Sequence, residues 1–121
     1  MSIHLLNQES LESLLEEIKD KKYFLLGEST HGTYEFYKYR FDITKILIEN
    51  YRLNIILFET EWSFGLKMND YIHKPFSSFE ALETETLEFL QEMYRGRFPQ
   101  WMWCNSVIME MLVYLRDWNK N

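Results

Sequence analysis

The chain has 121 residues, which is enough for one domain and argues against two. Hydrophobic residues make up 46% of the chain and aromatic residues 17%, so it can bury a core and does not belong to the disordered class. Thirteen Lys and Arg against nineteen Asp and Glu give a net charge of −6 without a dense basic run, which argues against a nucleic-acid partner.

The cysteine content and the first residues bear on the cellular compartment. A single cysteine, Cys104, cannot form an internal disulfide, so the chain is not typical of a small secreted scaffold. Residues 1–7 lack the basic segment and long apolar stretch of a signal peptide, and no apolar run reaches transmembrane length. We therefore expect a cytoplasmic protein without a membrane partner.

The first half of the chain predicts a helix followed by a βαβ unit. Behind Ser10, the expected N-cap, apolar residues recur at helical spacing: Leu11, Leu14, Leu15 and Ile18. Residues 23–26 and 54–58 are short runs that are apolar on both faces, typical of strands buried in a parallel sheet. A crossover helix is expected between them, from about Thr33 to Asn50, with one apolar stripe of Phe36, Ile43 and Leu47.

The second half of the chain predicts helices. One is expected over 62–72, broken before Pro75, and the S-x-x-E spacing of residues 77–80 opens another. That second helix carries the apolar residues Leu82, Leu87, Leu90 and Met93, and it ends by Gly96 and Pro99. A last helix is expected over 105–118, with Ile108, Leu112 and Leu115 on one face.

These elements predict a single α/β domain over residues 1–121, with a parallel βαβ core and flanking helices. A two-stranded parallel sheet is a poor endpoint, because such sheets are normally covered on both faces and have more strands. We therefore expect either the N-terminal part of a larger α/β fold or a sheet completed by a companion chain or by a second copy in a homo-oligomer.

Both predicted strands end in a carboxylate, Glu28 after the first and Glu59 after the second. Ligands of parallel sheets bind at the carboxyl ends of strands, so the two acids should lie side by side, close to His31 in the following loop. A histidine near two carboxylates suits a general base whose tautomer one acid fixes. The alternatives are a structural histidine and carboxylates that only cap helices.

Other residues are weaker candidates for a site. Arg40 interrupts the apolar stripe of the crossover helix and could pair with a strand-end carboxylate or extend to solvent. Four more residues either line a ligand pocket or belong to the core: Trp62, Asn69, Trp101 and Trp103. Ser29 and Cys104 lie outside a G-x-S-x-G nucleophile motif. A metal site of Glu28, His31 and Glu59 at the strand ends is the alternative to a metal-free site. The chain has no His-x-x-x-His or Cys pair, so the metal-free site is favoured.

Three sequence blocks together resemble the erythromycin esterase family: LGESTHGTYEF at 26–36, FETEW at 58–62 with Asn69 and Tyr71, and FPQWMWCN at 98–105. The first block matches the family pattern G-E-x-T-H-G-x-x-E-F at every defined position. The resemblance covers roughly residues 10–118, whereas family members are several times longer, so it implies the N-terminal portion of their fold.

The resemblance implies hydrolysis of a small-molecule ester or lactone, macrolides included, without a cofactor. It assigns the general base to His31 and further site positions to Glu28, Glu59 and Arg40. A histidine from the family's C-terminal region has no counterpart, because neither His4 nor His73 matches it, and Cys104 stands where many relatives carry a basic residue. The alternatives are a non-catalytic remnant that binds a small ligand or partner chain, and a gene fragment without an independent role.

Overall fold

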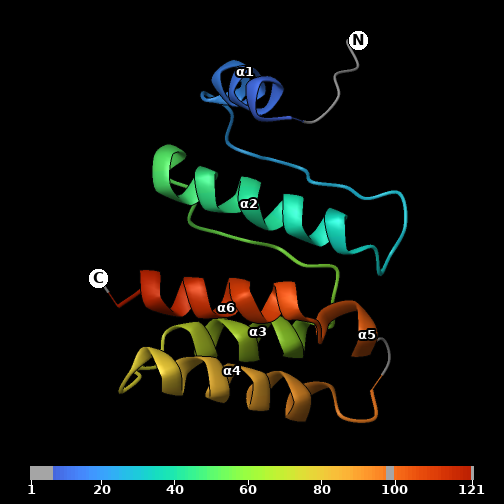
Figure 1. Ribbon diagram of the computed structural model, residues 1–121, viewed down its shortest axis with the longest axis vertical. Coiled ribbons are helices and arrows are strands. Elements are labelled where there is room, and N and C mark those ends of the chain that lie inside the picture. The colour runs from blue at the N-terminus through green and yellow to red at the C-terminus, as the bar shows by residue number, and fades with distance from the viewer. Residues whose placement is uncertain (1–6, 98–99, 121) are drawn as a thin grey trace.

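The computed structural model describes residues 7–97 and 100–120, and the regular secondary structure in these ranges is helical. The elements are α1 (Gln8–Ile18), α2 (Tyr34–Tyr51), α3 (Trp62–Ile72), α4 (Phe79–Tyr94), α5 (Gln100–Trp103) and α6 (Ser106–Trp118). Figure 1 shows α3, α4 and α6 grouped at one end of the molecule, α2 beyond α6, and α1 at the opposite end. The long helices after the first thus confirm the predicted segments to within about a residue.

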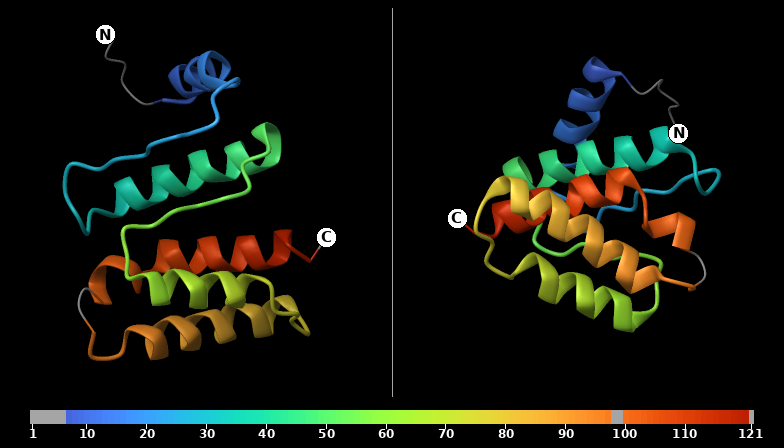
Figure 2. Two further views of the ribbon diagram at one scale, coloured as in Figure 1. Left: turned by 180° about the vertical axis from the view of Figure 1, so that it is seen from behind. Right: turned by 60° about the horizontal axis from the view of Figure 1, so that its bottom comes forward.

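The predicted α/β architecture with a parallel βαβ core is wrong for the described residues, which contain no strand and no sheet. Segments 23–26 and 54–58 are extended, but no backbone hydrogen bond joins one to the other in this part of the chain. Figure 1 shows them on either side of α2, and the reverse view in Figure 2 agrees. A strand requires a neighbouring backbone to pair with, and neither segment provides one for the other.

The two extended segments still show the alternation of strands. Phe24 packs against the small core beside α1, and Phe58 packs against the main core. The intervening side chains face solvent, with exposed fractions of 86% for Tyr23, 93% for Leu25, 67% for Ile55 and 88% for Leu57. The apolar runs therefore bury one face, and the second face that a parallel sheet would cover is open.

The main core lies among α2, α3, α4 and α6. Its most deeply buried side chains come from α4 and α6: Leu90, Tyr94, Val107 and Leu112. The face predicted for the last helix is confirmed, because Ile108, Leu112 and Leu115 are all buried. Of the apolar residues that α4 carries, Leu82, Leu90 and Met93 are buried and Leu87 is 44% exposed.

Three of the described helices have an N-cap side chain that accepts a backbone hydrogen bond from the first turn. Asn7 caps α1 and exchanges two hydrogen bonds with Ser10, which was the predicted cap and instead lies in the first turn. Ser78 caps α4 by accepting from the Ala81 N–H, and Asn105 caps α6 by accepting from the Ile108 N–H. These caps satisfy backbone donors that have no partner within their own helix.

A buried arginine of α6 ties the end of α3 and the middle of α4 to α6. Arg116 is 4% exposed, and its guanidinium donates to the Tyr71 hydroxyl at 2.7 Å and to the Glu85 carboxylate at 2.9 Å. It also donates to the backbone carbonyls of Lys74 and Pro75 at 2.9 and 2.6 Å. The guanidinium thereby neutralises an acid and fixes the turn that follows α3.

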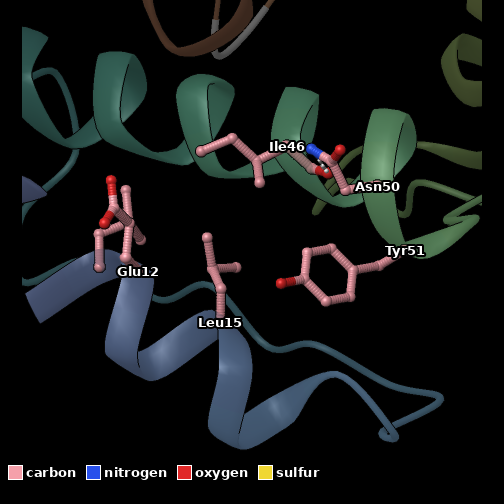
Figure 3. Close-up of a pocket in the computed structure, with 6 residues that line it drawn as sticks. Glu12, Leu15, Ile46, Asn50 and Tyr51 are labelled. Carbon is pink, nitrogen blue, oxygen red and sulfur yellow. Dashed lines mark hydrogen bonds between the residues drawn. The ribbon is translucent and has the colours of Figure 1, made fainter. Parts of the chain in front are cut away.

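The first helix packs loosely on the rest of the molecule. Leu11 and Leu15 of α1 meet Leu47 of α2 in a small second core. A cavity of about 300 Å³ lies between the two helices, and Figure 3 shows the Tyr51 side chain directed toward it. In the described part of the chain no helix is both long and apolar enough to cross a membrane.

Candidate functional site

The turn between the first extended segment and α2 places the candidate residues. Gly32 has φ of +79°, a left-handed conformation that glycine adopts without strain, and it lets the chain reverse into the helix. The hydroxyls of Thr30 and Thr33 lie 2.7 Å apart and close the turn. A Cβ atom at Gly32 would lie 3.8 Å from the indole of Trp101, so the turn packs directly against α5.

Glu28, His31 and Arg40 come together, and for Arg40 the structure shows the carboxylate pairing rather than extension to solvent. One oxygen of Glu28, Oε1, lies 2.5 Å from Nδ1 of His31, and the other, Oε2, lies 2.9 Å from Nη2 of Arg40. The Glu28 side chain is 12% exposed, Arg40 is 23% exposed and His31 is 45% exposed. A nearly buried carboxylate is thus held between an imidazole and a guanidinium, while the imidazole also reaches solvent.

This arrangement defines the chemistry available to the imidazole. A carboxylate is an acceptor, so Glu28 accepts a hydrogen bond from Nδ1–H of His31 and fixes that tautomer. The lone pair then lies on Nε2, which can take a proton. The guanidinium of Arg40 lies on the far oxygen of Glu28 and offsets its negative charge.

Of the predicted aromatic residues, one lies beside this cluster and another belongs to the core. The Trp101 ring centroid is 6.1 Å from that of His31, and the indole is 50% exposed. Trp103 is 5% exposed, packs edge-on against Phe58 at 5.1 Å and donates from Nε1 to the Glu59 carbonyl at 3.2 Å. Trp101 can therefore contact a ligand of the cluster, whereas Trp103 supports the fold.

The structure does not bring the other predicted residues to the cluster. The Glu59 side chain is exposed and forms no metal-binding group with Glu28 and His31, nor do the described residues hold any set of three such ligands. Trp62 is 80% exposed at the start of α3, and Asn69 is exposed on the same helix. Burial raises the pKa of the Cys104 thiol, which disfavours the thiolate nucleophile.

Sequence reasoning missed Tyr37. The buried positions of α2 are Tyr37, Phe41, Thr44, Leu47 and Ile48, so the apolar stripe predicted through Phe36 and Arg40 was one residue out of register for most of its length. Arg40 consequently lies beside the buried stripe, with its guanidinium carbon 4.9 Å from the centre of the Tyr37 ring. Tyrosine three residues before this arginine is the signal that could have revealed the pair.

Tyr37 faces the turn and a small cavity. Its side chain is 4% exposed, and its hydroxyl has no hydrogen-bond partner among the described residues. Burial raises the pKa of this phenol and the Glu28 charge raises it further, whereas the hydrogen-bond donors of the Gly32 backbone and of Arg40, which lie near the phenol oxygen, lower it. The phenol is therefore protonated at neutral pH and able to donate a hydrogen bond.

Comparison with known proteins adds one match. A family model described as erythromycin esterase matches residues 48–121. The matched segment contains Glu59, Trp62, Asn69, Trp101 and Trp103, and it begins after the cluster of Glu28, His31 and Arg40. No solved structure matches the chain.

Proposed function

Because the chain belongs to the erythromycin esterase family, we propose that it is a hydrolase of an ester or macrolactone bond in which His31 activates water. The observation that carries this proposal is the 2.5 Å contact between Nδ1 of His31 and Oε1 of Glu28. It supplies an oriented imidazole at the molecular surface, which is what a general base for water requires.

The proposed reaction uses two proton transfers. Nε2 of His31 takes a proton from water as the water oxygen attacks the carbonyl carbon of the ester, giving a tetrahedral intermediate. The imidazolium that forms is stabilised by the Glu28 carboxylate. It returns the proton to the leaving alkoxide when the carbon–oxygen bond breaks, so an acid and an alcohol result and His31 is neutral again.

The other site residues have supporting roles in this proposal. Arg40 holds the Glu28 carboxylate in place through their 2.9 Å ion pair. Trp101 lies beside the imidazole and contacts the substrate. The structure does not bring Glu59 to the cluster and buries Trp103 in the core, so neither has a role in this proposed reaction. We propose substrate contacts only for the exposed Trp62 and Asn69 of α3. Both lie in the segment that matches the family.

The proposal is tested by ester hydrolysis with the 121-residue chain. The substrates are p-nitrophenyl acetate and a macrolide lactone, and ring opening of the lactone is followed as the mass gain of one water. His31→Ala should lower kcat/KM about 10²–10⁴-fold, the usual contribution of a positioned general base. His73→Ala is the matched control, because His73 is exposed and contacts only the Asn69 carbonyl of its own helix among the described hydrogen bonds. Equal activity of His31→Ala and the parent chain would contradict the proposal.

A second function is favoured by the half-exposed indole of Trp101 beside the cluster. In this alternative the chain binds a small ligand or a partner chain without turnover. It predicts saturable quenching of tryptophan fluorescence by esters or macrolides that are recovered intact. Release of an acid and an alcohol from those compounds would contradict the alternative.

A further inference from the structure

A small cavity at the start of α2 adjoins the cluster, and the mechanism above does not use it. Its volume is about 120 Å³, and its walls include Gly32, Tyr34, Tyr37 and Trp101. This space suits a group of only a few non-hydrogen atoms. Because Gly32 follows His31 directly and the Trp101 ring lies 6.1 Å from the imidazole, a group in the cavity lies next to the proposed base.

One polar group in the cavity wall is buried and lacks a hydrogen-bond partner in the described part of the chain. This group is the hydroxyl of Tyr37, whose side chain lines the cavity. Asn105 also lines it, but its amide is occupied by the Ile108 N–H and the Met102 carbonyl. The phenol is therefore the buried polar group in this wall that still requires a partner, and it can donate.

The first turn of α2 adds positive potential to the same place. Thr33 precedes the helix without capping it through its side chain, because its hydroxyl lies 2.7 Å from that of Thr30. Uncapped N–H groups at the start of an 18-residue helix favour a negatively charged or electron-rich ligand. The acids nearby are Glu35, which lies in this first turn, and Glu28, whose charge is offset by Arg40.

We propose that this cavity is the acyl subsite of the enzyme, where the Tyr37 hydroxyl donates a hydrogen bond to the carbonyl oxygen of the ester and to the carboxylate of the acid product. The inference rests on the proposed hydrolase function and specifies where the acyl group lies. Trp101 lines the same cavity with a half-exposed indole, so a ligand that reaches the covered hydroxyl contacts this indole. Binding should therefore change tryptophan fluorescence.

The test is a fluorescence titration of the 121-residue chain with propionate, a small carboxylate product. The change should saturate at roughly millimolar concentration, as expected for so small a ligand. Propylammonium, of similar size and opposite charge, should cause no saturable change. The propionate signal should disappear in Trp101→Phe, and its persistence there would place the ligand elsewhere and overturn the proposal.

Tyr37→Phe removes only the hydroxyl and should weaken propionate binding about tenfold, the loss expected for a hydrogen bond to a charged acceptor. Its urea midpoint should change little, because the Tyr37 O–H donates to no group that the substitution would leave without a donor. Tyr94→Phe is the matched control, since Tyr94 is also buried with an unpartnered hydroxyl and does not line the cavity. Equal propionate affinity in Tyr37→Phe and Tyr94→Phe would overturn the proposal.

Kinetics separate failure of this inference from failure of the proposed function. If the parent chain binds propionate through Tyr37 but hydrolyses no ester, the hydrolase function fails and the carboxylate site stands. If the parent chain hydrolyses esters, Tyr37→Phe should lower kcat/KM and weaken inhibition by propionate. If Tyr37→Phe is active and neither its kcat/KM nor its inhibition by propionate differs from the parent chain, the acyl subsite is overturned and the hydrolase function stands.

Discussion

Single residues of the cluster were predictable where the sequence places them close together. Glu28 and His31 lie three residues apart in one turn, and Arg40 lies two turns into the helix that this turn begins. Their meeting depends on local backbone geometry that Gly32 makes accessible. Glu59 was expected beside Glu28 on the strength of a parallel sheet, and without that sheet nothing brings the two carboxylates together.

Removing the guanidinium from this cluster should destabilise the protein. In Arg40→Met the Oε2 atom of Glu28 is buried without its counter-charge, which should lower the free energy of unfolding by about 1–3 kcal/mol. Urea unfolding followed by tryptophan fluorescence measures the change. Adding Glu28→Gln should recover part of the loss. Lys38→Met removes an ion pair with Asp42 in which the side chains are 38% and 41% exposed, and it should cost at most about 0.5 kcal/mol; an equal cost for Arg40→Met would refute the argument.

At the scale of elements, helices and strands differed in how far the sequence could define them. Helix hydrogen bonds are internal, so the sequence pattern sufficed for α3, expected and found over Trp62–Ile72, and for α6, expected over 105–118 and found over Ser106–Trp118. Strand hydrogen bonds belong to a pair of segments. The apolar runs at 23–26 and 54–58 were predicted to be strands, and that prediction was wrong because such runs contain no information on whether a neighbouring strand is present.

The junction of α3, α4 and α6 depends on one side chain. Arg116→Met should lower the free energy of unfolding by about 2–4 kcal/mol, because two backbone carbonyls, the Tyr71 hydroxyl and Glu85 all lose a donor. The urea midpoint should fall with an unchanged slope. Arg95→Met at the exposed end of α4 is the control and should change stability by less than about 0.5 kcal/mol. Similar midpoints for the two variants would show that Arg116 is not required.

At the scale of the whole molecule, burial is uneven. The helices α3, α4 and α6 enclose a core with many side chains below a tenth exposed, whereas both extended segments leave alternate apolar side chains in solvent. Exposed apolar side chains on extended, unpaired backbone are a template for another chain, because both the side chains and the backbone groups gain from being covered. A second copy of the same chain is always present at the same concentration, so self-association is the expected consequence.

We therefore expect the purified chain to form dimers or larger species whose population rises with protein concentration, as measured by sedimentation equilibrium. Leu25→Lys and Leu57→Lys should shift it toward monomer, because each places a charge on a side chain that is about nine-tenths exposed in the single chain and covered in the assembly. Neither change disturbs the core, so helicity by circular dichroism should be retained. Leu66→Lys on α3, where the leucine is 47% exposed, is the control and should leave association unchanged. A parent chain that stays monomeric throughout the micromolar range would show that the exposed apolar faces of segments 23–26 and 54–58 do not drive self-association.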